Sequence, residues 1–416
     1  MAIIRPFKGI RPAPLLAAQV AELPYDVMTR EEAYEAAKGN PNSFLRVDKA
    51  EIDLDESIDI YDDRVYQKAR ENLDNMRNSG VLFQEAAPAL YIYRLTMDKR
   101  SQTGLVACTS IDEYLNNTIK KHELTREDKE LDRIKHVEHC NANTGPIFMA
   151  YQSDSAIRGI ITEFTEKRSP VYDFIAGDIG AGKGVCHTVW VINEPELITA
   201  LVDAFKKVPH FYIADGHHRT AAAAKVGLKR REESPDYNPE AEFNFCLSVL
   251  FPDDELLIMD YNRVVKDLNG LSKDAFLEKI SERFIVEKSE KEKPSKRHSF
   301  TMYLDGEWFK LTIKPGYIPG DNVEGLDVSI LQKQLLEPIL NIGDPRVDKR
   351  IDFVGGLRGL DELKRRVDSG EMQVAFAMFP TSMGELMAVA DEGKLMPPKS
   401  TWFEPKLRSG LFIHEL

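Results

Sequence analysis

A strand that ends in a cluster of polar residues and turns directly into a helix constrains the fold more than any other stretch. Residues 211–227 read FYIADGHHRTAAAAKVG, an apolar run followed by a polar turn and then alanines. A short apolar run that ends at a glycine turn is typical of a buried strand. Gly216 permits the tight turn, and the alanines favour a helix packed closely on the sheet. The segment predicts a strand–turn–helix unit that presents its polar turn at one end of a sheet.

The turn itself has the composition of an anion-binding site. The first helical turn after Gly216 carries unpaired backbone N–H groups and the positive end of the helix dipole. Arg219 adds a bidentate donor suited to phosphate or carboxylate. A simple helix cap would explain Asp215 but not the run His217–His218–Arg219 that follows it. We therefore predict that this turn binds a ligand or takes part in catalysis.

A second glycine-rich stretch imitates a phosphate-binding loop. Residues 177–184, GDIGAGKG, satisfy G-x-x-x-x-G-K, but Gly184 stands where a hydroxyl would have to bind Mg²⁺. The residues that follow, VCHTVWVI, favour a strand, whereas a phosphate-binding loop must open a helix. We interpret the stretch as a glycine hairpin and assign Lys183 no role.

The stretch 120–141 is dense in charge and predicts one long helix. His136 and His139 lie three residues apart, a spacing that places two metal ligands on one helical face, although no third ligand stands at a recognised spacing. The favoured interpretation is a solvated charged helix. A metal site is the alternative, and an active-site helix with Arg133 and His136 facing a substrate lies between the two.

Two further segments carry chemistry-bearing residues. In AELPYDVMT, residues 21–29, Glu22 and Asp26 flank a rigid proline turn, and either carboxylate would supply the general base that the DGHHR turn lacks. The C-terminal MPPKSTWFEPKLRSGLFIHEL is rich in residues suited to an anion site or to a packed tail, namely Lys399, Ser400, Thr401, Lys406 and Arg408.

Composition sets the broad class. The chain has 416 residues and a formal charge of −13, which argues against a nucleic-acid-binding protein. Four scattered cysteines give no disulfide framework, and neither a signal peptide nor a membrane-spanning run is evident, so we expect a soluble, cytoplasmic protein. The pattern of strands and helices predicts an α+β protein of two domains, with a mixed sheet in residues 1–268 and a smaller α+β domain in 269–416.

Several motifs together resemble a known family. PYDV, NANTGPIF, GVCHTVW, ADGHHR with its alanines, YNRVV and MPPKSTWFEPKLRSGL are similar to the bacterial family known as domain of unknown function 1015. These motifs span nearly the whole chain. The family name implies no activity.

The DGHHR turn, with a strand before it and a helix behind it, is also similar to the loop of the ParB/sulfiredoxin superfold. Members of that superfold, which include chromosome-partitioning proteins, sulfiredoxin and kinases of free serine, bind nucleotide phosphates there. The resemblance implies a ParB/sulfiredoxin-like core within residues 1–268. The chain lacks sulfiredoxin's reactive cysteine, because His217 stands at that place, and it lacks the basic helix-turn-helix of the partitioning proteins.

The kinase resemblance implies a role for each residue of the turn. The donor phosphates of ATP or ADP would rest on Gly216, His218, Arg219 and Thr220. Asp215 would orient Mg²⁺ or the acceptor hydroxyl, and His217 would stabilise the transferring charge.

For the base we expect Glu22, with Asp26 second. We thus expect a kinase of a small hydroxyl-bearing metabolite such as free serine. The alternatives are a regulatory nucleotide-binding module without turnover, and a metal-dependent hydrolase that uses His136, His139 and the pair His217–His218.

Overall fold

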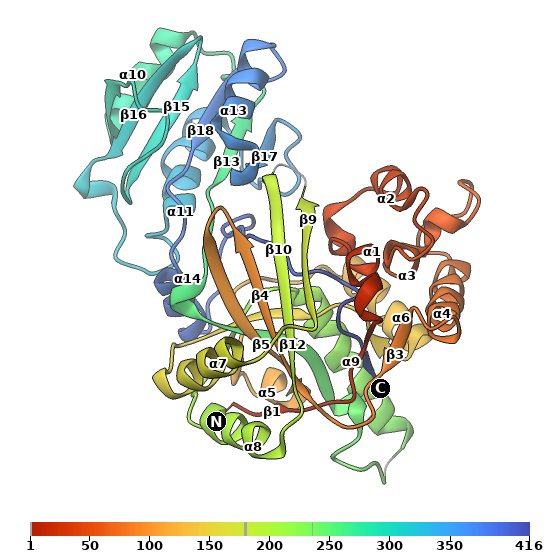
Figure 1. The fold of residues 1–416 in the computed structure, drawn as a ribbon. Helices are drawn as coiled ribbons and strands as arrows, with labels where there is room; N and C mark the ends of the chain where they lie inside the picture. Colours follow the sequence, from red (N-terminus) through yellow and green to blue (C-terminus); the bar gives the residue numbers. More distant parts are fainter. Residues whose placement is uncertain (1, 179–180, 235) are drawn as a thin grey trace. The chain divides into compact units, whose positions relative to one another are not determined.

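The computed structural model describes residues 2–178, 181–234 and 236–416, and the chain forms two compact units (Figure 1). Unit 1 comprises Met1–Leu256 together with Pro405–Leu416, and unit 2 comprises Leu257–Glu404. The expected boundary near residue 268 differs from this division. The strand Tyr261–Val265 pairs within the sheet of unit 2, and the last residues of the chain return to unit 1.

Unit 1 is built on a mixed sheet, as expected. The strand order is β6-β11-β8-β12-β5-β4-β10-β9, and β1 pairs with β5 at one end of that strand. The pairs β6/β11 and β8/β12 are parallel, and the other pairs are antiparallel. The strands are β1 (Ile4–Arg5), β4 (Leu90–Met97), β5 (Arg100–Ser110), β6 (Ile119–Lys120), β8 (Ile147–Tyr151), β9 (Tyr172–Asp178), β10 (Ala181–Ile192), β11 (Phe211–Asp215) and β12 (Phe245–Pro252).

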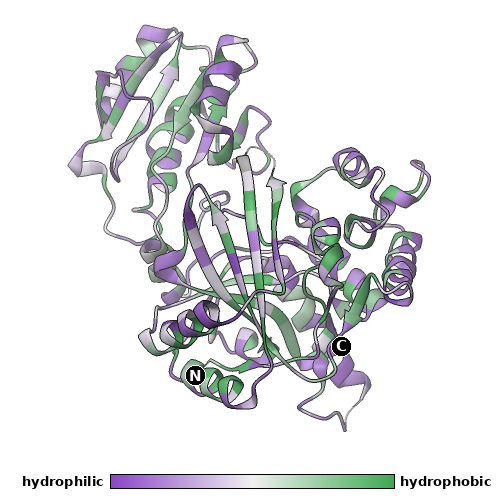
Figure 2. Cartoon of the chain, in the orientation of Figure 1, coloured by the Kyte–Doolittle hydropathy of each residue, from purple (hydrophilic) through white to green (hydrophobic). Residues whose placement is uncertain are grey.

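Apolar side chains of this sheet form the main core together with two helices. Ile157 of α7 (Ser155–Lys167) and Phe205 of α8 (Pro195–Phe205) are fully buried in the same cluster as Ile213 and Leu250 of the strands. Figure 2 shows hydrophobic residues along these strands and hydrophilic residues on the outer faces of the helices. The remaining helices of this part are α5 (Ile111–Leu115), α6 (Glu127–Cys140) and α9 (His217–Glu233).

The N-terminal residues form a second, helical layer of unit 1. Val65, Ala69, Leu73 and Met76, spaced three and four residues apart, are buried on one face of α4. Ile413 of the C-terminal tail joins the same core cluster. The elements are α1 (Ala17–Val20), α2 (Arg30–Ala37), α3 (Leu45–Asp48), α4 (Asp63–Asn78), β2 (Ile10–Pro12), β3 (Leu82–Gln84), β7 (Ala142–Asn143) and β19 (His414–Glu415).

Unit 2 has an antiparallel sheet of its own, in the order β14-β16-β15-β18-β13-β17. A hairpin joins β15 and β16 through Asp305–Gly306, and both residues have positive φ as a two-residue hairpin turn requires. The strands are β13 (Tyr261–Val265), β14 (Phe284–Lys288), β15 (Ser299–Leu304), β16 (Glu307–Ile313), β17 (Ile351–Gly355) and β18 (Val374–Ala377). The helices are α10 (Lys273–Arg283), α11 (Asp327–Leu331), α12 (Glu337–Leu340), α13 (Gly359–Asp368) and α14 (Met383–Asp391).

Candidate functional site

The predicted strand–turn–helix unit is formed by β11, Gly216 and α9. Gly216 has φ +97°, in the left-handed region that glycine adopts without strain. A Cβ atom at this position would lie 3.1 Å from Nε of Arg219, because the guanidinium folds back over the glycine. The N–H and the Oγ1 of Thr220 both donate to the carbonyl of Gly216 at 3.0 Å, which closes the first turn of the helix. The Thr220 hydroxyl expected to face a cofactor thus also has a local backbone partner.

Asp215, the last residue of β11, forms an ion pair with the C-terminal tail. Nζ of Lys406 donates to Oδ2 of Asp215 at 2.9 Å. Burial by itself would raise the pKa of the Asp215 carboxyl, but the charges of Lys406 and Arg219 hold this pKa well below its usual range. Asp215 is therefore a carboxylate that draws two cations to the turn.

The two histidines of the turn have different environments. The side chain of His217 is 6% exposed, and its ring meets that of His122 edge-on with the centroids 4.6 Å apart. The ring of His218 is half-buried, and its Nε2 accepts a hydrogen bond from the backbone N–H of Arg126 at 3.1 Å. Burial lowers the pKa of both imidazoles, which favours their neutral forms.

Arg219 lies at the rim of a small cavity. Its Nη1 donates to the carbonyl of Pro146, and its buried Nε has no hydrogen-bond partner among the described residues. The cavity has a volume of about 20 Å³, room for one water-sized group. Besides Arg219 it is lined by Tyr25, Asp48, Arg133, His136, Val137, Asn143, Thr144, Gly145 and Ser409.

Helix α6 supplies one wall of this cavity. Arg133 forms an ion pair with Asp132 at 2.8 Å, and its guanidinium stacks over the ring of Tyr25 at 3.8 Å. His136 Nε2 donates to the carbonyl of Val47 at 3.1 Å. The expectation of a solvated helix is wrong here, because these side chains are buried against the N-terminal helical layer. Arg133 and His136 both line the cavity beside Arg219.

The metal pair considered for α6 does not form. The ring of His139 hydrogen-bonds to the carbonyl of Lys135, and that of His136 is held by Val47. Among the described residues, neither ring belongs to a cluster of metal-ligating atoms. The helix also begins later than residue 120, because β6 and a loop occupy residues 119–126.

Glu22 is held beside the C-terminal tail. Its backbone pairs with Ser409 in an antiparallel bridge, and the hydroxyl of Ser43 donates to its Oε1 at 2.6 Å. Burial raises the pKa of Glu22, against the opposing effects of Ser43 and the Arg408 charge. Asp26 is exposed on the short turn Tyr25–Val27, where its charge acts on His218. Of the two candidate bases, Glu22 is thus the half-buried one, and Ser43 fixes its orientation.

The C-terminal tail connects these groups. Lys406 pairs with Asp215, Ser409 lines the cavity, and the backbone N–H of Arg408 donates to the hydroxyl of Tyr93 at 3.4 Å. Lys399, Ser400 and Thr401 belong to unit 2. No role was predicted from the sequence for Ser43, Tyr25 or Ser409. Ser43 lies in none of the quoted motifs, whereas Tyr25 lies in PYDV and Ser409 in the C-terminal motif, and those motifs were the signal that could have indicated them.

The GDIGAGKG stretch belongs to a hairpin, as interpreted from the sequence. β9 and β10 pair in antiparallel fashion up to Asp178 and Ala181, and residues 179–180 lie outside the described part of the chain. No helix follows, so the geometry of a phosphate-binding loop is absent from the described residues there.

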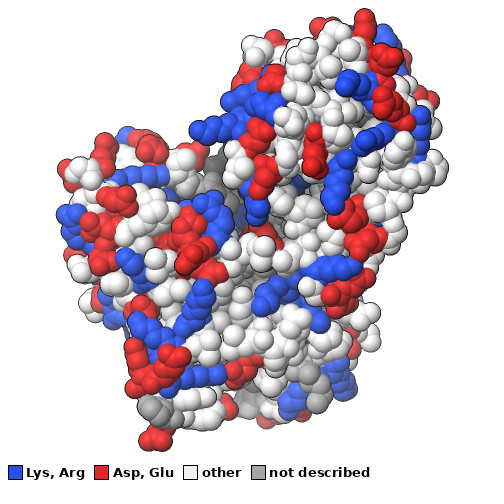
Figure 3. Space-filling view, turned by 180° about the vertical axis from the view of Figure 1, so that it is seen from behind, with Lys and Arg blue, Asp and Glu red and all other residues white. Residues whose placement is uncertain are grey.

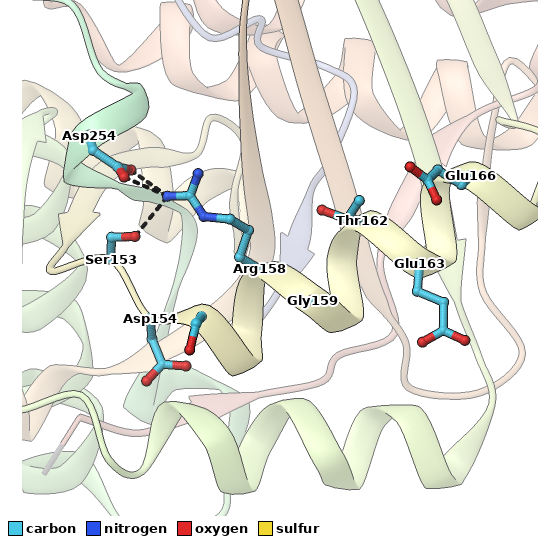
Figure 4. A pocket seen from close by; sticks show the side chains of 9 residues that line it. Ser153, Asp154, Arg158, Gly159, Thr162, Glu163, Glu166 and Asp254 are labelled. Atoms are coloured by element: carbon cyan, nitrogen blue, oxygen red, sulfur yellow. Dashed lines mark hydrogen bonds and ion pairs between the residues drawn. The ribbon is translucent and has the colours of Figure 1, made fainter.

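A separate hollow lies on α7 (Figure 4). Its volume is about 840 Å³, and its acidic lining includes Asp154, Glu163 and Glu166. Its Arg158 is already paired with Asp254 at 2.6 Å. An acidic hollow whose arginine is neutralised is poorly suited to an anion, so the DGHHR turn stays the better candidate.

Surface charge bears on nucleic-acid binding, and hydropathy bears on whether a helix could span a membrane. Figure 3 shows Lys and Arg interspersed with Asp and Glu over the face it presents, a mixture that does not favour the phosphate backbone of a nucleic acid. Within the described ranges, no helix combines the length and the apolar character needed to cross a bilayer.

Comparison with solved structures finds distant similarity. A free serine kinase in complex with AMP is 16% identical, with a TM-score of 0.36 and coverage of 74% of this chain and 91% of the other. A conserved hypothetical protein from Pyrococcus furiosus is 17% identical, with a TM-score of 0.35 and coverage of 74% and 94%. A C-terminally truncated SbnI from Staphylococcus aureus is 10% identical, with a TM-score of 0.37 and coverage of 72% and 82%.

Among curated proteins there is no match. The model of one protein family, described as a protein of unknown function (DUF1015), matches residues 4–329. This match covers more than half of the sequence, and the chain therefore belongs to the DUF1015 family.

Proposed function

We propose that this protein transfers a phosphoryl group from ATP or ADP to the hydroxyl of a small metabolite such as free serine, and that the turn 215–219 holds the donor phosphates. The observation that carries the proposal is the guanidinium of Arg219. It is folded over Gly216 at the start of a long helix, and its buried Nε has no partner among the described residues. A buried cationic N–H without an acceptor is costly, and a phosphate oxygen would satisfy it.

The charges around the turn support an anionic ligand. Lys406 and Arg219 both act on Asp215, and Arg133 lines the same cavity as Arg219. The N-terminus of α9 adds the unpaired amides and the dipole of a helix. Asp48 lines the same cavity and Asp132 pairs with Arg133, so carboxylates and cations alternate around the turn. A phosphate would bind here through the cations Arg219 and Lys406.

Glu22 has the properties of the general base in this proposal. In the reaction, the acceptor hydroxyl gives its proton to the Glu22 carboxylate while its oxygen forms a bond to the terminal phosphorus. The bond from that phosphorus to the bridging oxygen breaks, and the shortened nucleotide leaves with the electron pair. The Ser43 hydroxyl fixes the orientation of the base, and burial raises its pKa toward a value useful for proton transfer.

Asp215 does not fit the role of a magnesium ligand in this geometry. Its Oδ2 accepts from Lys406, and it belongs to no cluster of three ligating groups among the described residues. A Mg²⁺ ion needs several oxygen ligands and would compete with the ammonium for this carboxylate. We therefore assign Asp215 the task of positioning Lys406 and Arg219, and we derive no step from a protein-bound metal.

The first test is turnover by the purified full-length chain. ATP and ADP are supplied separately with Mg²⁺ and with pooled hydroxyl amino acids, and phosphorylated product is measured by mass spectrometry. Product formation that is lost in Asp215→Asn supports the proposal. Nucleotide binding without product from any acceptor pool would instead favour a regulatory binding module. Absence of both binding and turnover would overturn the phosphate assignment.

The second test measures nucleotide affinity in Arg219→Ala. Loss of charge-assisted hydrogen bonds to a phosphate should weaken binding about 10- to 100-fold by calorimetry. Arg158→Ala is the matched control, since its guanidinium is half-exposed and pairs with Asp254 away from the turn. Equal nucleotide affinity in the two variants would contradict the assignment.

A further inference from the structure

Two parallel strands end side by side just before three potential metal ligands. β6 and β11 are paired in parallel, with Ile119 opposite Phe211 and Lys120 opposite Tyr212. Their carboxyl ends therefore meet at the same edge of the sheet. His122 and Glu123 follow β6, and His217 follows β11 after the Gly216 turn. The topology thus brings an imidazole and a carboxylate from one loop to an imidazole from the other.

The three side chains are close enough to share an ion. One ligand atom from each of His122, Glu123 and His217 lies within 4.8 Å of the others. The contact between His217 Nδ1 and Glu123 Oε2 is 3.9 Å, and the two rings are perpendicular. Ligand atoms around a tetrahedral zinc are about 3.3 Å apart, so the cluster must contract slightly. The Glu123 side chain is 49% exposed, and its Oε2 is the carboxylate oxygen that faces His217.

A buried nitrogen gives an independent sign of a ligand. The side chain of His217 is 94% buried, since 6% of it is exposed, and its Nε2 has no hydrogen-bond partner among the described residues. A ring nitrogen placed in this way loses its water without gaining a protein partner, which is unfavourable. A metal ion bound through this Nε2, and not through the Nδ1 that lies 3.9 Å from Glu123, would satisfy it.

The surroundings of His122 also suit a metal ligand. Its ring is fully buried and forms a hydrogen bond with the Ile213 backbone, the kind of support that orients a metal-binding histidine. Two charges lie near the cluster: Lys121 opposes a cation, and Asp215 favours one. The carboxylate of Glu123 supplies the negative charge that a divalent ion requires.

We propose that His122, Glu123 and His217 form a binding site for a divalent transition-metal ion of the zinc type. Two imidazoles and one carboxylate select such an ion over Mg²⁺ or Ca²⁺, which prefer oxygen ligands. The bound ion joins the loop after β6 to the first turn of α9. It thereby restricts the backbone of the DGHHR turn, residues 215–219. With three protein ligands, the ion keeps one position for water.

The test is metal binding by the full-length chain without any nucleotide, so its outcome does not depend on the proposed kinase activity. The protein is stripped with a chelator and titrated with Co²⁺, followed by visible absorption, and with Zn²⁺, followed by elemental analysis. We expect one equivalent per chain and a thermal midpoint that rises with the ion present. A wild-type chain that takes up neither ion stoichiometrically overturns the proposal.

Variants separate this site from adventitious binding. His122→Gln should reduce uptake to background, and Glu123→Gln should weaken affinity at least about tenfold. Glu123 is half-exposed, so its variant is expected to fold even if that of His122 does not. His139→Gln is the matched control, since its ring is held by the carbonyl of Lys135, and it should keep one equivalent. Retention of wild-type affinity in both His122→Gln and Glu123→Gln would place any bound ion elsewhere.

Discussion

Glu22 is a carboxyl group whose properties are set by three neighbours. Removal from water raises its pKa, and the Ser43 hydroxyl and the Arg408 charge oppose that rise without cancelling it. The backbone bridge to Ser409 fixes the position of its main chain. A group of this kind is a stronger base than an exposed glutamate, because its pKa is raised.

This setting predicts the pH dependence of turnover. The base acts as a carboxylate, so the rate should fall as the pH drops through the Glu22 pKa. Because that pKa lies above the usual 4.5, the fall should begin at a higher pH than an ordinary glutamate would give. A profile of kcat against pH checks this. A rate that stays constant down to the ordinary glutamate pKa would exclude Glu22 as the base.

Glu22→Gln should separate chemistry from binding. Loss of a general base lowers kcat by roughly 100- to 10,000-fold, while nucleotide affinity should stay near that of the wild type. Glu163→Gln, on the exposed face of α7, is the control and should leave both quantities unchanged. If Glu22→Gln keeps the wild-type kcat, Glu22 is not the general base and another group accepts the proton.

Single-residue predictions from the sequence succeeded where a motif named the residue and failed where burial decided its state. Gly216 was expected to turn the chain, and it does so with a positive φ. The pairing of Asp215 with Lys406 spans 191 positions, and no local pattern indicates a contact of that separation. Long-range contacts of this kind are set by the fold as a whole, which short spacing rules do not describe.

At the scale of elements, the junction of β11 and α9 depends on the backbone of Gly216. Gly216→Ala should destabilise the protein by about 1–2 kcal/mol through left-handed strain alone. The new Cβ, 3.1 Å from Arg219 Nε, would also displace the guanidinium. Denaturant unfolding measures the first effect, and nucleotide affinity measures the second.

Gly159→Ala is the control for this substitution. Gly159 is an exposed interior residue of α7, and a Cβ there meets nothing within 4 Å. Its replacement should stabilise the helix by up to about 1 kcal/mol. If both alanine variants are stabilised, the strain attributed to Gly216 is absent.

Elements with regular apolar spacing were predictable, and the charged ones were not. Val65, Ala69, Leu73 and Met76 recur at spacings of three and four, a period that indicates a helix with one buried face, as α4 has. In α6 the buried face carries Asp132, Arg133 and His136. Their polar side chains led to the prediction of a solvent-exposed helix, whereas the structure buries this face beside the cavity. Paired charges can be buried at acceptable cost, and hydropathy does not record the pairing.

At the scale of the whole molecule, the buried carboxyl of Glu113 links stability to pH. Glu113, in α5, accepts a hydrogen bond from the backbone N–H of Ile3 at 3.1 Å, and burial raises its pKa from 4.5 to about 7. The folded state thus holds this proton more tightly than the unfolded state. The stabilisation is fully present below about pH 4.5 and is lost as the pH rises to about 7.

Replacement of the Glu113 carboxyl should make the free energy of unfolding less dependent on pH. The wild type should lose on the order of 3 kcal/mol of unfolding free energy over that interval from Glu113, and Glu113→Gln should not. Urea unfolding at both ends of the interval measures the difference. Glu166→Gln, exposed on α7, is the control and should follow the wild type. Parallel profiles for wild type and Glu113→Gln would refute this role.

The division into units also departs from the sequence expectation for a physical reason. Composition changes little near residue 256, whereas strand pairing assigns β13 to the second sheet. The tail 405–416 looks like the end of the second domain by position alone. Its buried Leu411, Phe412 and Ile413 instead pack in unit 1.

This return of the tail sets the order in which the molecule is completed during synthesis. Unit 2 is translated between the two parts of unit 1, which takes roughly 7–30 s at common elongation rates. Throughout that interval Asp215 has no Lys406 to pair with and Glu22 has no Ser409. A nascent chain therefore lacks both contacts until residues 405–416 have left the ribosome.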